Sequence, residues 1–194
     1  QVFINETQLS GAIISANISG GRLEVLDSTV SDITVGTGGF SVGLTNVVTN
    51  GIVQSVQDAK GCQFKSQVRT KGDSTINITS NTFADGTFLF IDSACGGSIK
   101  GNDFNTGVTT PISWARAFGG DTQFSNLVIS GNYANGTSSQ FINEYSDFLY
   151  TDGMTADVYG NYYNQAQLSN LTANTINKGN PNFKIGENLD SVKT

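Results

Sequence analysis

The chain offers few side chains that could carry out chemistry. It contains no His and only two Cys, Cys62 and Cys95. Because the usual base of a nucleophilic triad is missing, the sequence argues against triad catalysis. Two Cys without any His also provide too few ligands for a Cys/His zinc site. Asp85-Gly86 and Asp152-Gly153 are typical of turns rather than of calcium-binding loops.

One aromatic and basic cluster could contact a ligand. Arg116 lies between Trp114 and Phe118, an arrangement that would suit a sugar-binding surface. The alternative is an aromatic pair packed in the core with Arg116 on the outer face. No stretch gathers Lys and Arg, and the net charge is -6, so nucleic-acid binding is not expected.

The composition predicts an all-β protein with many turns. Only 13% of the residues are charged, and the 23 Gly are accompanied by abundant Asn, Ser and Thr, which are poor helix interiors. The 12 Phe and 6 Tyr provide enough apolar surface for a folded core. No apolar run reaches the ~18–20 residues that a membrane span needs.

A short pattern recurs along the chain: an apolar residue, two arbitrary residues, an Asn and, two residues later, a residue that is usually apolar. Ile76 and Ile78 alternate with polar residues before one such Asn, which indicates a strand with one buried face. The Asn would lie at a turn, where it tolerates the left-handed conformation, and stacked coils would align the Asn side chains in a ladder. The spacing fits the coils of a solenoid rather than hairpins. The predicted ladder residues are Asn50, Asn81, Asn102, Asn132 and Asn161.

This pattern resembles the right-handed parallel β-helix of the pectate-lyase-like superfamily. The residues that carry the resemblance are Ile78–Phe83, Ile99–Phe104 and Val158–Tyr163, together with the tail Gly179–Phe183. The resemblance covers about residues 45–185 and implies a fold rather than a function. An antiparallel β-sandwich or jelly roll, with similar composition and alternation, is the alternative.

The resemblance implies polysaccharide lyases and hydrolases, but their residues are not found. The hydrolase motifs of this fold, among them Asn-Thr-Asp, an Asp-Asp pair and Gly-His-Gly, are absent. A lyase would need clustered acids for calcium and a basic residue, and the nearest candidates are Asp92, Asp103, Lys100 and Arg116. These acids are as easily solvated turn residues, so we predict no enzymatic activity and no cofactor.

We predict a disulfide between Cys62 and Cys95. In an exported protein such a bond would close a loop of about 34 residues and would stabilise the fold by roughly 3–4 kcal/mol. A separation of about one coil would let the two residues meet between neighbouring coils. Two buried free thiols, which behave as small apolar side chains, are the alternative.

Several features indicate an exported chain. It begins at Gln1 rather than Met, as a mature chain does after its signal peptide is removed, although a trimmed chain would look the same. Five Asn-x-Ser/Thr sequons occur, a number close to that expected by chance, and we expect at least one to carry a glycan. The candidate acceptors are Asn5, Asn17, Asn77, Asn135 and Asn170.

The first twenty residues are less regular than the rest. Residues 1–20 form either an N-terminal β-strand arm or the first coil, and residues 21–194 form the solenoid domain. The arm could add as a strand to a neighbouring molecule, and head-to-tail contacts of this kind build fibres. The residues expected in this assembly strand are Val2, Phe3, Ile4, Ile13 and Ile14.

These observations predict an extracellular structural protein that assembles with itself into a surface filament, fibre or spike, on a cell or a virion. The alternative function is a carbohydrate-binding or polysaccharide-cleaving module, with glycans as partners. A glycan array or a reducing-sugar assay would separate the two.

Overall fold

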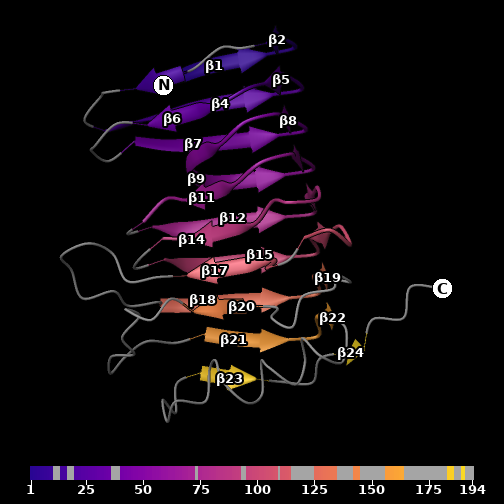
Figure 1. Cartoon of the computed structure of the whole chain (residues 1–194). Coiled ribbons are helices and arrows are strands. Elements are labelled where there is room, and N and C mark those ends of the chain that lie inside the picture. The colour runs from indigo at the N-terminus through magenta and orange to yellow at the C-terminus, as the bar shows by residue number, and fades with distance from the viewer. Residues whose placement is uncertain are drawn as a thin grey trace.

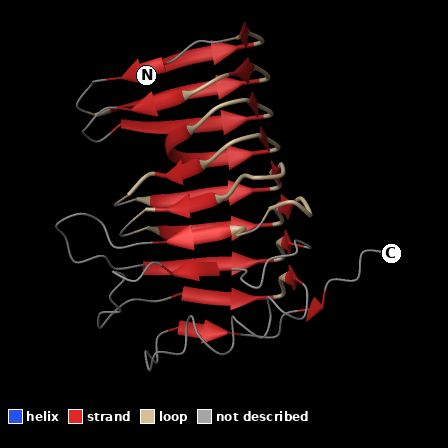
Figure 2. Cartoon of the chain, viewed as in Figure 1, coloured by secondary structure: helices blue, strands red, loops and turns tan. Residues whose placement is uncertain are grey.

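The computed structural model of the 194-residue chain is built from strands. It describes residues 1–10, 14–16, 20–35, 40–72, 74–92, 95–108, 110–114, 125–134, 142–144, 156–163, 183–185 and 189–190. Within this part of the chain there is no helix, as Figure 2 shows. The prediction of an all-β protein is confirmed. Every pairing between described strands is parallel, which contradicts the antiparallel sandwich alternative.

The described strands form two parallel sheets, a 15-stranded large sheet and a 9-stranded small sheet. One series in the large sheet consists of β1 (Val2–Asn5), β4 (Gly21–Leu26), β7 (Phe40–Thr45), β9 (Val53–Lys60), β12 (Thr75–Thr79), β15 (Gly96–Lys100), β18 (Ser125–Ser130), β21 (Ala156–Tyr159) and β23 (Phe183–Ile185). Its second series consists of β3 (Ile14–Ala16), β6 (Ile33–Val35), β11 (Val68–Thr70), β14 (Leu89–Ile91), β17 (Ile112–Trp114) and β20 (Ile142–Glu144). The small sheet consists of β2 (Gln8–Leu9), β5 (Thr29–Val30), β8 (Val48–Thr49), β10 (Gln63–Phe64), β13 (Thr82–Phe83), β16 (Asp103–Phe104), β19 (Tyr133–Ala134), β22 (Tyr162–Tyr163) and β24 (Leu189–Asp190).

Along the chain, a strand of the first series is followed by a strand of the small sheet and then by a strand of the second series. We call one such repeat a rung. Each rung places a strand of the first series beside its counterpart in the next rung, so that β12, β15, β18 and β21 lie in order. The register keeps like residues together, because Ile78 pairs with Ile99 and Ile99 pairs with Ile129. The rungs succeed one another from β1 at one end to β23 at the other (Figure 1).

Strand β9 joins the two series of the large sheet. Its first residue, Val53, pairs with Ile33 of β6 and Val68 of β11, whereas its last residues pair with β7 and β12. Ser55 has a φ of 57°, in the left-handed region, and the ladder register shifts close to it. This local bend lets one continuous strand pass from one face to the other.

The apolar residues of successive rungs form continuous buried rows. Period-2 alternation buries Ile76 and Ile78 and leaves Asn77 exposed, as the sequence predicts. Three residues of the small sheet, Phe64, Phe83 and Phe104, are buried in a stack. The ring centroids of Phe64 and Phe83 lie 5.1 Å apart, and those of Phe83 and Phe104 lie 4.5 Å apart. Stacking like side chains at the rung spacing fills the interior without requiring long helices or loops.

The N-terminal residues pair within their own chain. Val2–Asn5 are in register with Leu23–Leu26, and β2 and β3 pair with β5 and β6. Strands β1, β2 and β3 therefore form the first rung and continue both sheets. Ile13 of the predicted assembly strand lies outside the described residues.

The predicted disulfide is wrong, because Cys62 and Cys95 are both buried free thiols. Cys62 follows the end of β9, whereas Cys95 precedes the start of β15. The two residues thus lie at opposite ends of equivalent strands. A strand of five residues is about 16 Å long, far beyond the Cα separation of about 4.4–6.8 Å that a disulfide allows.

Candidate functional site

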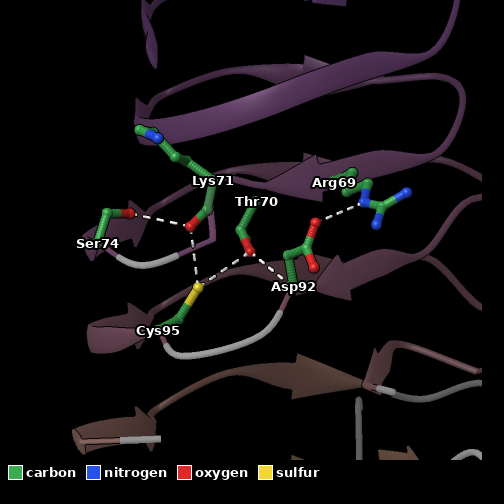
Figure 3. Close-up of polar contacts among 6 residues, drawn as sticks. All are labelled: Arg69, Thr70, Lys71, Ser74, Asp92 and Cys95. Carbon is green, nitrogen blue, oxygen red and sulfur yellow. Dashed lines mark hydrogen bonds and ion pairs between the residues drawn. The ribbon is translucent and has the colours of Figure 1, made fainter. Parts of the chain in front are cut away.

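The outer face of the second strand series carries an ionic and aromatic cluster, which we call the Arg69 cluster: Arg69, Phe90 and Asp92. The Nε of Arg69, in β11, donates to Oδ2 of Asp92 over 2.7 Å, just after the end of β14 (Figure 3). The guanidinium carbon lies 5.2 Å from the centroid of the Phe90 ring. The Arg69 side chain remains 43% exposed, so the cluster is open to solvent.

A buried polar layer fixes the backbone behind this cluster. The Thr70 hydroxyl accepts the backbone N–H of Asp92 over 2.9 Å and lies 3.5 Å from Cys95 Sγ. Cys95 Sγ donates to the carbonyl oxygen of Lys71 over 3.0 Å, and Ser74 Oγ donates to the same oxygen over 2.9 Å (Figure 3). These bonds link β11 to the turn after β14 and hold Arg69 and Asp92 in register.

The Arg69 cluster combines a cation, a carboxylate and an aromatic ring, which is a set suited to contacting a polar ligand. It holds neither a His base nor an exposed nucleophile, since Thr70 and Cys95 are buried. Of these three residues, only Asp92 was predicted from the sequence as a candidate site residue. The alternation of Arg69 between buried Val68 and Thr70 was the available signal that it points outward.

The acids and bases predicted for a lyase site are not brought together. Asp92 follows a strand of the large sheet, whereas Asp103 belongs to β16 of the small sheet. Lys100 ends β15 and is exposed. Arg116 and Phe118 lie outside the described residues, as does the side chain of Trp114. In the part of the chain that the structure describes, no group of three or more His, Cys, Asp or Glu could hold a metal ion.

A second charged cluster, on the outer face of the first series, pairs one cation with two carboxylates. Arg22 pairs with Glu24 in its own strand, and its Nη2 lies 2.8 Å from Oδ2 of Asp58 in β9. The guanidinium crosses over Gly43 of β7, where any Cβ would overlap it. Burial lowers the pKa of Arg22, but its bonds to Glu24 and Asp58 outweigh burial and raise the pKa above its ordinary value. These groups satisfy one another, so the cluster is structural.

Four of the five predicted ladder residues form the ladder: Asn81, Asn102, Asn132 and Asn161. The Nδ2 of each of the first three donates to Oδ1 of the next, over 2.9, 2.8 and 2.9 Å in turn. Their side chains are at most 1% exposed. Each amide except that of Asn81 also accepts the backbone N–H of the preceding ladder residue, and Asn81 accepts that of Cys62. The ladder therefore pairs buried backbone N–H groups along four successive rungs, from Asn81 to Asn161.

Asn50 does not belong to the ladder. The register pairs Gln63 with both Val48 and Thr82, so the residue equivalent to Asn81 is Val47 in one rung and Cys62 in the next. The prediction that the ladder Asn adopts the left-handed conformation is also wrong. The preceding residue adopts it instead: Ser80 at φ 56°, Gly101 at 62°, Gly131 at 63° and Gly160 at 60°.

Cys62 occupies the position equivalent to Asn81, but its side chain is a thiol rather than an amide. Burial raises the pKa of the Cys62 thiol to about 11, although nearby backbone hydrogen bonds oppose the shift. At pH 8 only roughly a thousandth of the thiol would be ionised, and the thiolate is the reactive form.

We expect iodoacetamide to leave Cys62 unlabelled in the folded chain at pH 8, and its labelling to rise about tenfold per pH unit towards pH 11. Peptide mass spectrometry without reduction would follow the reaction, with urea-unfolded chain as the control in which both thiols react. Labelling of native Cys62 within minutes at pH 8, or a native disulfide, would refute this expectation.

The first rung leaves a strand edge and apolar side chains open. Within the described residues, β1 pairs only with β4, and β2 pairs only with β5. Val2 is 50% exposed and Phe3 is 64% exposed, whereas Leu23, which is in register with Val2, is buried. An edge of unpaired N–H and C=O groups beside apolar side chains is a template for another strand.

Comparison with known proteins gives no relative: no protein-family model, no curated protein and no solved structure matches the chain. In its described part, no helix has the length and apolar character to cross a membrane.

Proposed function

We propose that this protein is an extracellular structural subunit that assembles with itself, head to tail, into a filament, fibre or spike at a surface. The observation that carries the proposal is the open edge of β1, with Val2 and Phe3 exposed beside it. We further propose that the two parallel sheets form a right-handed parallel β-helix of the pectate-lyase-like type, because the strands of successive rungs pair in order. Residues 1–20 would then serve both as first rung and as interface.

The occupant that we propose for this edge is the opposite end of a second copy. At that end β23 continues the large sheet, with Phe183 in register with Ala156 and Ile185 with Val158. These are the positions that Val2 and Ile4 hold in the first rung, next to Leu23 and Val25. The register thus aligns both terminal strands with the same rows of paired residues in the large sheet. Stacking β1 of one copy on β23 of another would continue those rows and add backbone hydrogen bonds.

Other features support a structural role over catalysis. The buried Asn side chains of the ladder form hydrogen bonds with one another and with backbone N–H groups. The charged residues of the Arg22 cluster pair with one another. The Arg69 cluster is the observation that favours the alternative, a carbohydrate-binding module, because an exposed Arg beside an aromatic ring can contact a sugar. We place this alternative second, because the Arg69 guanidinium already pairs with Asp92 and lies over the Phe90 ring.

The assembly proposal predicts that Val2→Lys abolishes self-association. Val2 is half exposed in the single chain, where a Lys is tolerated, but it would become buried between Leu23 and the second copy. Burying an unpaired charge is strongly unfavourable, so association should weaken at least a hundredfold. Sedimentation velocity over a range of concentrations measures this change.

The matched control is Ile52→Lys. Ile52 lies between β8 and β9 with 41% of its surface exposed, comparable to the value for Val2, and neither of these strands belongs to a terminal rung. This variant should associate as the unmodified chain does. Equal effects of the two substitutions, or an unmodified chain that stays monomeric at high concentration, would overturn the proposal.

A further inference from the structure

Two of the five sequons have their acceptor Asn in the described part of the chain. Asn5 lies in the terminal strand β1, and Asn77 lies in β12, near the middle of the large sheet. Both side chains are exposed. Asn77 is the more informative, because its neighbours on both sides are described.

The polar contacts of Asn77 leave its amide nitrogen available. Asn77 is in register with Asp58 of β9 and Ser98 of β15. Ser98 Oγ donates to Oδ1 of Asn77 over 3.1 Å. Among the described residues no group bonds Nδ2, so the amide is held by its oxygen while its nitrogen faces solvent. An N-linked sugar replaces one hydrogen of Nδ2 and keeps Oδ1 as an acceptor, so the Ser98 bond survives the modification.

The ladder amides show the opposite arrangement. Nδ2 of Asn102 donates both hydrogens, to the carbonyl oxygen of Ile78 over 2.9 Å and to Oδ1 of Asn132 over 2.8 Å. That side chain is 1% exposed. A sugar could not be accommodated there without breaking the ladder. The fold therefore separates buried structural amides from an exposed amide that has a vacant nitrogen.

The other two residues of the sequon, Ile78 and Thr79, also lie where glycosylation of Asn77 requires them. Ile78, the middle residue, points into the core and is fully buried, and Thr79 follows on the same outer face as Asn77. The flanking Asp58 and Ser98 are small, and Asp58 is 42% exposed. A glycan on Asn77 would extend from the side of the sheet, away from the terminal rungs.

We propose that Asn77 is an N-glycosylation site and that its glycan covers the outer face of the large sheet around β12. The co-reactant is an oligosaccharide linked through pyrophosphate to a lipid. The bond between the sugar C1 and the pyrophosphate oxygen breaks, the bond from C1 to Nδ2 forms, and Nδ2 loses one proton as the lipid pyrophosphate leaves. The inference rests on the proposed export of the chain, because such donors act in the secretory pathway.

The test is to secrete the full chain from yeast or cultured animal cells behind a signal peptide. Enzymatic deglycosylation in heavy-oxygen water followed by peptide mass spectrometry then marks every Asn that carried a glycan. We expect the Asn77 peptide to be labelled in most of the secreted chain. Thr79→Ala should abolish that label and Thr79→Ser should retain it, since the hydroxyl and not the methyl group defines the sequon.

Asn5 in the same digest is the internal comparison. A secreted chain with Asn77 unlabelled, whether or not Asn5 is labelled, overturns the inference, as does a label that survives Thr79→Ala. Self-association is measured on chain made in bacteria, which adds no such glycan. The secreted chain therefore tests the glycan site, and the bacterial chain tests the assembly proposal, so the two failures can be distinguished.

Discussion

Asn102→Ala should lower the free energy of unfolding by about 4 kcal/mol or more. Oδ1 of Asn102 accepts the backbone N–H of Asn81 over 3.0 Å and the Nδ2 of Asn81 over 2.9 Å. Its Nδ2 donates to Ile78 and Asn132. Truncation would leave four buried polar groups without these partners, each costing roughly 1–3 kcal/mol, although the costs are not additive. Urea unfolding followed by circular dichroism measures the loss.

Asn105→Ala is the matched control in the following segment of the same rung. Asn105 is exposed, and only its backbone groups are bonded in the described part of the chain. Its substitution should change stability by less than about 0.5 kcal/mol. If the two variants unfolded at the same urea concentration, the ladder would not be the stabilising element that its geometry indicates.

Phe83→Ala should destabilise the fold by about 3–5 kcal/mol. Phe83 is fully buried between Phe64 and Phe104 in the aromatic stack. Removing the ring leaves a cavity that neighbouring rungs, fixed by backbone pairing, cannot easily fill. The midpoint of urea unfolding reports the effect.

Phe83→Leu provides the comparison for this second variant, because it preserves most of the buried volume. We expect it to cost about 1–2 kcal/mol, clearly less than the Ala variant. A Leu variant as unstable as the Ala variant would mean that ring stacking rather than volume dominates. Negligible loss in both variants would contradict the buried stack.

The sequence predicted the strands well because their signal is local. Alternation around Ile78 and Ile129 specifies which face is buried, and parallel register follows once like residues are stacked. The ladder was predicted at Asn81 and at the three later positions for the same reason. There the Asn follows Gly or Ser, which adopts the left-handed conformation.

The errors arose where position depends on distant segments. Asn50 fits the same sequence pattern as Asn81, but it is preceded by Thr49, which does not adopt the left-handed conformation. The residue that adopts it at the equivalent turn of that rung is Asn46. Rung lengths vary too: the ladder positions lie 19, 21, 30 and 29 residues apart from Cys62 onward. A fixed coil length therefore misplaced Cys62 relative to Cys95.

The Arg69 cluster could not be predicted because its members come from different rungs. Arg69 and Asp92 are separated by 23 residues, and their contact depends on the register between β11 and β14. Phe90 pairs directly with Arg69 in that register. No spacing in a single sequence shows this before the rung length is known.

The most direct test of the proposed assembly is electron microscopy of the concentrated, unmodified 194-residue chain. The small sheet contributes nine described strands to the stack, and neighbouring strands lie about 4.8 Å apart. Head-to-tail stacking of whole chains therefore predicts unbranched filaments with an axial repeat of roughly 43 Å, shorter than this only if terminal rungs overlap. Filaments with that repeat, absent from Val2→Lys, are the expected result. A chain that remains monomeric at every concentration, or filaments that Val2→Lys leaves intact, would contradict the account.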